Sequence, residues 1–419
     1  MYNVGIALLL GLFTSTAWAG GLWVYEMGTP DLGTAAAGRA ALASDPSTAF
    51  GNPAGMTRLQ GSQLLIGFQP AFSSIEFDPG SGTTVAGSDG GNAGGFLPGL
   101  SSFFVYSATP DIKLGVSVVS YAGGLLDYED NWVGRYYVQE SDLLTAAVNP
   151  VIAYRVNDWL SVGGGPSLVY GYLKAKTAIN NVLDRFPDGQ LKFEDSDVGY
   201  GGNIGILLEP RPDTRFGITY ITKVDLDFKD TLKLKDLGPG LNAILNRRGL
   251  LGSRVDMGLT LPQQVMASGY YEVTDRWALM ANVGWQNWEK FGQPELSIDS
   301  TETTSFTADL DYKDTWHVAI GGQYRYTDRW LFSAGFAYDS SPMSTSERSP
   351  ALPMDRQLRF GTGVQYRWKE NLTVGAAYEF LDLGDADIDR RKGPLAGTLQ
   401  GDYKSNHVNF FAVNVDWKF

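Results

Sequence analysis

Large apolar residues alternate with small or polar residues along most of this chain, with the two-residue period of a β-strand. In residues 330–338 the even-numbered positions are Trp, Phe, Ala, Phe and Tyr, and the positions between them are Leu, Ser, Gly and Ala. Residues 358–368 and 372–380 repeat this pattern. A soluble β-sandwich turns such bulk inward, whereas a membrane barrel turns it to the lipid and keeps polar side chains in the lumen.

Connection lengths separate these two architectures. Fourteen strand candidates begin near residues 62, 99, 112, 141, 158, 190, 214, 252, 276, 304, 329, 356, 371 and 402. Six connections are tight, at residues 109–111, 156–158, 211–213, 274–275, 327–328 and 369–371, and they alternate with seven longer, polar, Gly-rich ones. Short turns on one rim, long loops on the other and an even strand number are typical of bacterial outer-membrane barrels. We therefore expect an all-β, 14-stranded antiparallel transmembrane β-barrel in the outer membrane of a Gram-negative bacterium.

Tryptophan positions support this topology independently. Five of them fall on the rim of short turns, where an aromatic girdle meets the lipid headgroups. These five are Trp159, Trp277, Trp330, Trp368 and Trp417. Trp285 and Trp288 come at the far end of their strand, and we assign them to the outer girdle.

Residues 1–19 are expected to be an export signal peptide. Residues 4–13 form an apolar run of ten, too short to span a bilayer, and Ala17-Trp18-Ala19 is a small-x-small cleavage site. No Lys or Arg precedes the run, and the alternative is a buried N-terminal helix. Nowhere else do 18 consecutive apolar residues occur, so no transmembrane helix is expected.

The last strand candidate ends the chain on an aromatic residue. Residues 411–419 alternate Phe, Val, Val, Trp and Phe with Ala, Asn, Asp and Lys. A terminal aromatic residue on such a strand resembles the signal read by the outer-membrane barrel assembly machinery. We expect that machinery and the outer-membrane lipids to be partners of the chain, and the inserted barrel to be a monomer.

Residues 20–60 do not alternate and are therefore not part of the wall. They are rich in Ala and Gly, and residues 34–43 are expected to form a short helix that Asp45-Pro46 ends. The apolar content of the segment favours a plug packed in the lumen over a disordered leader. The predicted organisation is a signal peptide at 1–19, a plug at 20–60 and a transmembrane barrel at 61–419.

The plug carries a family resemblance. Its small-residue stretch, followed by Asn52-Pro53-Ala54-Gly55 and Arg58-Leu59, resembles the N-terminal hatch of the outer-membrane long-chain fatty acid transporter family, which also includes aromatic hydrocarbon transporters. The resemblance covers essentially the mature chain. It implies a hatch-plugged barrel that passes hydrophobic molecules through the lumen and out sideways through the wall. Of the family's hatch motif, Asn52, Pro53 and Ala54 carry over directly, whereas residues 25–30 depart from the fatty-acid-specific members.

Two long loops look suited to ligand capture. Their apolar residues recur at helical spacing, which predicts an amphipathic helical turn in each. In the first loop these residues are Ile179, Val182, Leu183 and Phe186, and in the second they are Leu241, Ile244 and Leu245. Facing each other, the two stretches form either an apolar capture groove or a lid.

The alternation of side chains between the two faces of a strand indicates which residues point into the lumen, and glycines within strands indicate where the wall could open. His317, Arg325 and Arg359 face the lumen, where a ligand carboxylate would require a cation and a neutral ligand would not. Side exit requires a gap in the hydrogen bonding between strands, and Gly123 and Gly124 end the third strand candidate. The family places its kink in the third strand, so we rank these two above residues 163–165.

Composition excludes several other functions. The chain has no Cys, two His and a net charge of -13, which excludes thiol catalysis, Cys-ligated metals and a basic nucleic-acid surface. No G-x-S-x-G motif occurs, so we expect no catalytic residue, no metal and no cofactor. We expect passive uptake of long-chain fatty acids or similar hydrophobic molecules. The alternatives are an aromatic hydrocarbon channel of the same family and a general diffusion porin.

Overall fold

The computed structural model describes residues 22–23, 25–181, 183, 186–299, 304–307, 310–393 and 395–419. The predicted signal peptide at 1–19 lies outside the described residues. None of the helices in the described part of the chain is both long enough and apolar enough to cross a membrane.

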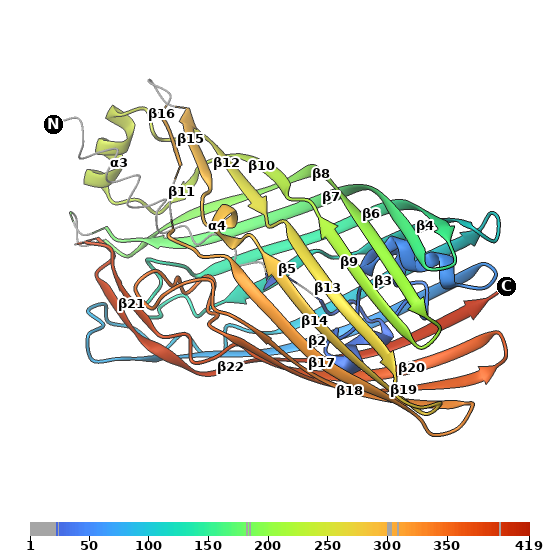
Figure 1. Ribbon diagram of the computed structural model, residues 1–419. Helices are drawn as coiled ribbons and strands as arrows, with labels where there is room; N and C mark the ends of the chain where they lie inside the picture. Colours follow the sequence, from blue (N-terminus) through green and yellow to red (C-terminus); the bar gives the residue numbers. More distant parts are fainter. Residues whose placement is uncertain are drawn as a thin grey trace.

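A closed antiparallel barrel of fourteen wall strands forms most of the molecule (Figure 1), as the alternation predicts. The barrel closes because the first wall strand pairs with the last. The wall consists of β2 (Gln63–Pro79), β3 (Phe96–Ser107), β4 (Ile112–Val119) continued by β5 (Ala122–Asp127), β6 (Glu140–Asn157), β7 (Leu160–Ile179), β8 (Gly189–Arg211), β9 (Thr214–Ile221), β13 (Gln264–Glu272), β14 (Trp277–Gln286), β17 (Thr315–Arg325), β18 (Trp330–Asp339), β19 (Gln357–Lys369), β20 (Leu372–Asp382) and β22 (Thr398–Lys418).

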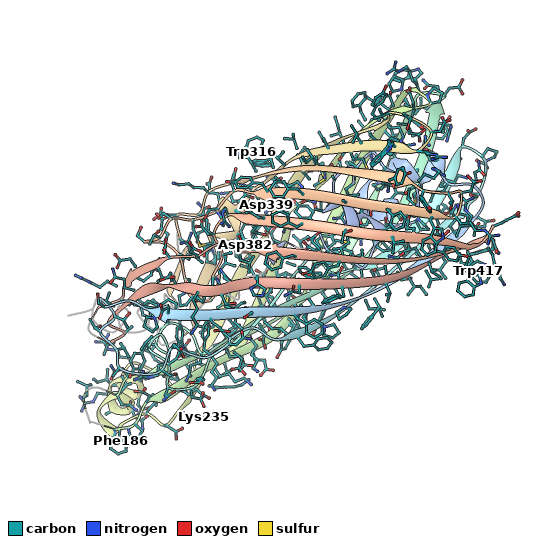
Figure 2. All side chains as sticks on the ribbon, turned by 90° about the horizontal axis from the view of Figure 1, so that it is seen from below. Phe186, Lys235, Trp316, Asp339, Asp382 and Trp417 are labelled. Atoms are coloured by element: carbon teal, nitrogen blue, oxygen red, sulfur yellow. The ribbon has the colours of Figure 1, made fainter. Side chains whose placement is uncertain are left out.

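The two rims differ as the connection lengths predict. All six tight connections join neighbouring strands at one rim. The five tryptophans assigned to that rim are all exposed, and Figure 2 places Trp417 at the end of the barrel opposite Phe186. The assignment of Trp288 to the outer girdle is wrong. Its side chain is buried, packs against Phe291 and donates a hydrogen bond to Gln286 Oε1, because the chain leaves the wall at Gln286.

A second sheet of four strands stands at the long-loop end and pairs in the order β10, β12, β15, β16. The strand candidates expected near residues 252 and 304 begin in this sheet, as β12 and β16, and the eighth and tenth wall strands begin instead at Gln264 and Thr315. Alternation alone does not distinguish a wall strand from a strand of an outer hairpin. The smaller elements at this end are β10 (Val224–Thr231), β11 (Lys233–Lys235), α3 (Pro239–Arg247), β12 (Arg254–Leu261), α4 (Trp288–Phe291), β15 (Glu295–Asp299), β16 (Thr304–Thr307) and β21 (Ile388–Arg391).

Residues 25–59 form the hatch, a compact segment that lies inside the ring of strands towards the short-turn end (dark blue in Figure 1). Its elements are η1 (Pro30–Thr34), α2 (Thr48–Gly51) and η2 (Pro53–Arg58). The helix expected over residues 34–43 is wrong. Ala35 and Ala36 have φ of 49° and 60°, which a right-handed helix excludes, and successive turns follow them.

Small residues on the inner face of the wall make room for the hatch. A Cβ atom on Gly217 of β9 would overlap the carbonyl oxygen of Ala40, and one on Gly335 of β18 would overlap that of Thr34. Hatch backbone therefore lies directly against strand backbone. This close approach explains why the inner face is small or polar while the outer face is bulky.

Candidate functional site: a lateral cavity through the wall

The third wall strand is broken, and the break opens the wall. It consists of β4 and β5, which both pair with β6 on one side. On the other side, β3 pairs with β4 only between Ser102 and Ser107. In the described part of the chain, residues 96–101 of β3 pair with β2 alone. The facing edge of β5 pairs at Ala122 and Gly123 with the short strand β1 (Leu22–Trp23), so β3 and β5 do not pair with each other and a gap separates them.

Pro98 suits the unpaired edge of β3. Proline has no backbone N–H and is tolerated where a strand has no neighbour to receive a hydrogen bond. Pro98 stands opposite Pro70 in the β2–β3 register, and two prolines cannot exchange hydrogen bonds. The backbone of Pro98 therefore turns towards the gap, where its missing N–H leaves no buried donor unsatisfied.

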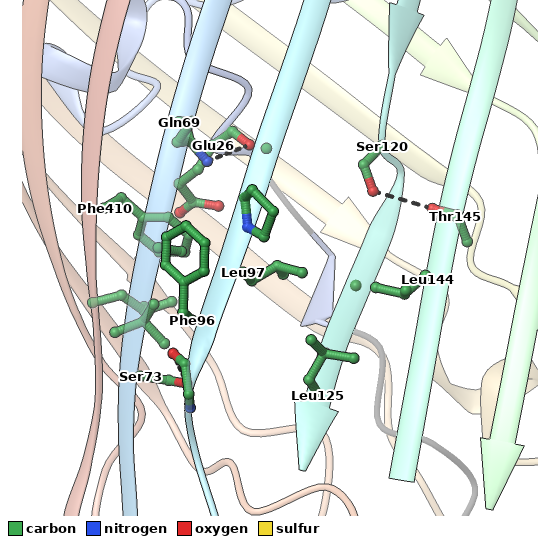
Figure 3. A pocket seen from close by; sticks show the side chains of 18 of the residues that line it. Glu26, Gln69, Ser73, Phe96, Leu97, Ser120, Leu125, Leu144, Thr145 and Phe410 are labelled. Atoms are coloured by element: carbon green, nitrogen blue, oxygen red, sulfur yellow. Dashed lines mark hydrogen bonds between the residues drawn. The ribbon is translucent and has the colours of Figure 1, made fainter.

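A cavity of about 540 Å³ fills this gap and continues into the lumen. At the membrane face it is lined by exposed side chains, including Phe96 and Leu100, the latter 73% exposed. At the lumen face it is lined by buried side chains such as Met354 and Phe410. Figure 3 shows Phe96 and Leu97 on one side of the gap, with Leu125 and Leu144 on the other. This lateral cavity is a mostly apolar passage from the lumen to the lipid.

Charged side chains line only the inner end of the lateral cavity, at Glu26 of the hatch and Arg359 of β19. Arg359 Nε donates to Glu26 Oε1 at 2.8 Å, and Nη2 donates to Gln357 Oε1 at 2.9 Å. Arg359 also forms an ion pair with Asp339, and Glu379 Oε1 lies 3.7 Å from its Nε. We call Arg359 with Glu26, Asp339 and Glu379 the carboxylate cluster.

The carboxylate cluster is buried, with the side chains of Arg359, Glu26 and Glu379 each 2% exposed. Burial raises the pKa of the Glu26 carboxyl, but the charge of the neighbouring Arg359 guanidinium and the hydrogen bonds from Glu379 and Arg359 together outweigh this, so the pKa lies below its ordinary value. Glu26 is therefore held as an anion. The cluster joins the hatch to the wall through a salt bridge 333 residues apart in sequence.

Of the three residues that the strand alternation predicts to face the lumen, two lie at the carboxylate cluster and one lies elsewhere. Arg359 lies in the carboxylate cluster, and His317 Nδ1 is 2.9 Å from Asp339 Oδ1 in the same cluster. The His317 ring also packs on Tyr25, with centroids 4.6 Å apart. Arg325 is exposed near the short-turn rim and lines a separate, polar cavity of about 380 Å³.

The Asn52-Pro53-Ala54 motif fixes the hatch against the wall. Asn52 Nδ2 donates to the carbonyl oxygens of Ala40 at 2.6 Å and Ile206 at 3.0 Å, and its Oδ1 accepts from Ala54 N at 3.1 Å. Asn52 is fully buried. Pro53 begins η2, where its missing N–H costs no hydrogen bond. The motif thus connects two hatch segments and β8 through one side chain.

Tyr121 connects the hatch to the break in the third wall strand. It lies between β4 and β5 and is 1% exposed. Its hydroxyl donates to Asn149 Oδ1 and accepts from Ser167 Oγ, both at 2.7 Å. Its ring lies 5.3 Å from the ring of Phe50 in α2.

The glycine candidates for the opening also differ in their surroundings. Gly123 and Gly124 lie in β5 and line the lateral cavity. A Cβ on Gly123 would lie 3.9 Å from Leu97 Cδ2, across the gap. A Cβ on Gly163, by contrast, would lie 2.7 Å from Ala54 N. Gly163 therefore accommodates the hatch, whereas Gly164 and Gly165 lie against the neighbouring strands β8 and β6.

The two capture loops differ in structure from each other. The helical turn expected over residues 179–186 is wrong, because Ile179 ends β7 as a buried strand residue, and Leu183 and Phe186 are exposed in a turn and coil. β7 stays paired with β8 up to Ile179, which lies opposite Gly189. Val182 lies outside the described residues.

The second loop contains the helix α3, as its spacing predicts. Leu241 and Leu245 are buried on one face of α3, and Ile244 is partly exposed. The two loops lie together, since Gly238 N donates to Asn181 Oδ1 and Asn181 Nδ2 donates to the carbonyl oxygen of Asp236.

Several residues of the site were missed from the sequence. Glu26 and Asp339 lie in the carboxylate cluster, and Leu352 and Met354 of a long loop line the lateral cavity. Proline is no sufficient signal for the opening, because Pro150 and Pro166 also lie inside wall strands that are paired on both sides.

Comparison with known proteins gives a consistent result. A family model described as "Outer membrane protein transport protein (OMPP1/FadL/TodX)" matches residues 10–419. A "Long-chain fatty acid transport protein" of Escherichia coli O6:H1 is 29% identical over 99% of this chain and 98% of its own. "Outer membrane protein P1" of Haemophilus influenzae is 26% identical over 99% of this chain and 98% of its own.

Solved structures share the fold. A Pseudomonas aeruginosa FadL homologue has a TM-score of 0.86 at 23% identity and covers 96% of this chain and 100% of its own. The Ralstonia pickettii toluene transporter TbuX has a TM-score of 0.68 at 20% identity and covers 94% of this chain and 100% of its own.

Proposed function

Because the chain belongs to the family of outer membrane transport proteins that includes OMPP1, FadL and TodX, we propose that it carries hydrophobic small molecules passively across the outer membrane. The molecules enter the lumen from outside and leave sideways through the lateral cavity. Similar proteins bear the names of fatty acid and toluene transporters, and both ligands are hydrophobic. Diffusion requires no catalytic residue or cofactor, and we assign none.

The observation that carries this proposal is the continuity of the lateral cavity from buried lumen residues to exposed membrane-facing ones. The free energy of an apolar solute falls by about 25 cal/mol per Å² of apolar area buried when the solute moves from water to an apolar surface. A water-filled pore would provide no such stabilisation. A mostly apolar passage therefore suits a hydrophobic ligand better than a hydrophilic one.

The hatch argues against the general-porin alternative. Its close contacts with the inner face of the wall, at Gly217 and Gly335 among others, occupy the space through which water and ions would pass. At the outer end, we propose that α3 and the loop that Asn181 ties to it receive the ligand first. We further propose that the barrel assembly machinery recognises the strand ending in Phe419 and that the barrel is a monomer.

Filling the gap tests the lateral route. Gly123→Trp places an indole between β5 and β3, where a Cβ already lies at contact distance from Leu97. Gly269→Trp is the matched control, because residue 269 lies on β13, away from the lateral cavity. The assay is uptake of labelled palmitate and labelled toluene by cells that lack their own transporter.

We expect Gly123→Trp to lower uptake of the transported ligand at least about tenfold, while Gly269→Trp does not. Both variants must reach the membrane folded, as judged by heat-modifiable migration in gels. Equal uptake by the two variants would exclude the lateral cavity as the route. Loss of uptake on collapse of the proton-motive force would exclude passive transport.

A further inference from the structure

We propose that the lateral cavity accepts uncharged hydrophobic molecules and discriminates against carboxylate anions. This inference rests on the proposed function and specifies the class of ligand. The carboxylate cluster at the inner end of the cavity carries it. A ligand that binds along the apolar passage with its polar end inward meets this cluster.

The charge balance of the cluster is negative. Three carboxylates, from Glu26, Asp339 and Glu379, surround the single guanidinium of Arg359. With every group ionised the sum is −2, and a proton held on one carboxylate leaves −1. His317 Nδ1 lies 2.9 Å from Asp339 Oδ1, and His317 is not among the residues that line the lateral cavity. The four residues of the carboxylate cluster therefore carry a net negative charge in both cases.

Arg359 is already engaged by protein acceptors. Its Nε, Nη1 and Nη2 donate to Glu26, Asp339 and Gln357 respectively. An incoming carboxylate would have to displace one of these acceptors, and the displaced group would stay buried without its partner. Breaking one partnership of a buried charge cluster is strongly unfavourable.

The uncharged polar groups of the lining are also paired. Gln69 accepts from Gly28 N through Oε1 and donates to the carbonyl oxygen of Glu26 through Nε2. Ser73 exchanges hydrogen bonds with Gly95. Ser120 donates to the carbonyl oxygen of Ala122. Figure 3 shows the Gln69–Glu26 bond at the inner end of the lateral cavity.

An anion in the lateral cavity would therefore lose its hydration without gaining a counter-charge. The remaining lining is apolar, which strengthens the repulsion from the carboxylate cluster because the local dielectric constant is low. A hydroxyl group at the same position would instead face carboxylate oxygens that accept hydrogen bonds. The arrangement therefore favours hydrocarbons and long-chain alcohols over fatty acid anions.

Decanol and decanoate provide a matched pair of probes, since they differ only in the polar end. Binding of each labelled compound is measured by equilibrium dialysis against the purified full-length mature chain in amphipol, at about pH 8, where the free acid is ionised. Binding to Gly123→Trp is subtracted as the contribution from outside the lateral cavity. We expect decanol to bind at least about tenfold more tightly than decanoate.

Glu26→Gln then tests the origin of the preference. Removing one negative charge beside Arg359 is expected to raise the decanoate-to-decanol affinity ratio about tenfold or more. Asp158→Asn makes the same charge change at an exposed turn and is expected to leave the ratio unchanged. The comparison of decanol with decanoate on wild type does not use Glu26→Gln, so it remains decisive if that variant does not fold.

The outcomes separate this inference from the proposed function. If decanoate binds wild type as tightly as decanol or more so, the inference is wrong and the lateral route stands. If neither probe binds wild type better than Gly123→Trp, the lateral cavity holds no such ligand, and both proposals fail. If Glu26→Gln and Asp158→Asn shift the ratio equally, the carboxylate cluster is not its cause.

Discussion

Phe50 of the hatch packs on Tyr121 at the break in the third wall strand, with the two rings 5.3 Å apart and inclined by 52°. This contact links the segment that fills the lumen to the point where the wall opens. Both residues are buried, and Phe50 immediately precedes the Gly51-Asn52 end of α2. A displacement of the hatch would therefore reach the lateral cavity directly through this pair.

Phe50→Ala is expected to loosen the hatch. Truncating a buried phenylalanine typically costs about 3–5 kcal/mol of stability. The loss falls on the hatch, so we expect faster cleavage of residues 25–59 by an added protease while the barrel stays intact on a gel. Phe186→Ala serves as the control, because that side chain is 54% exposed in a loop. Equal cleavage rates in the two variants would show that the Phe50–Tyr121 contact does not hold the hatch.

Gly217→Ala is expected to displace the hatch, because the added Cβ overlaps the carbonyl oxygen of Ala40. Gly269→Ala on the neighbouring strand β13 adds the same methyl group, whose nearest neighbour is the Phe216 ring at 3.8 Å. Planar-bilayer recordings should show frequent ion-conducting openings for Gly217→Ala and few for Gly269→Ala. If both stay silent, the hatch adapts to the methyl group, and close backbone packing is not required.

Asn52→Ala removes three hydrogen bonds at once. It leaves the carbonyl oxygens of Ala40 and Ile206 and the N–H of Ala54 without this partner in a buried site. Each unsatisfied group costs roughly 1–3 kcal/mol. We therefore expect faster amide hydrogen exchange at residues 52–58 than in wild type. Asn246→Ala, on the exposed face of α3, is the control and should leave exchange in the hatch unchanged.

The wall was predictable from the sequence because its signal is local. Each strand shows its outer face through a two-residue period, and each tight turn is marked by Pro, Asn or Asp within a few residues. This information suffices for fourteen strands and two unlike rims. It does not suffice for the eighth and tenth wall strands, because residues 254–261 and 304–307 have the same local character but pair with β10 and β15 in another sheet.

The hatch and the site depend on contacts distant in sequence. Residues 34–43 have the composition of a helix, yet the surrounding wall imposes turns, and Asn282 and Ser268 accept from the backbone of Gly38 and Ala40. Intrinsic helix propensity is a weak predictor of structure, and tertiary packing of this kind overrides it. Glu26 and Arg359 likewise meet only after the barrel closes around the hatch, so the strand alternation placed Arg359 in the lumen without its partners.

Arg359→Gln tests how much the carboxylate cluster contributes to the fold. Removing the only guanidinium among three buried carboxylates is expected to cost roughly 3–5 kcal/mol. Arg356→Gln is the matched control, because Arg356 pairs with one carboxylate, Asp382, and both side chains are more than 30% exposed. A pair of that kind contributes about 0–1 kcal/mol. The free energy of unfolding follows from urea titration of the tryptophan fluorescence of each variant in the same detergent, and a smaller loss for Arg359→Gln than for Arg356→Gln would contradict a buried, fully engaged cluster.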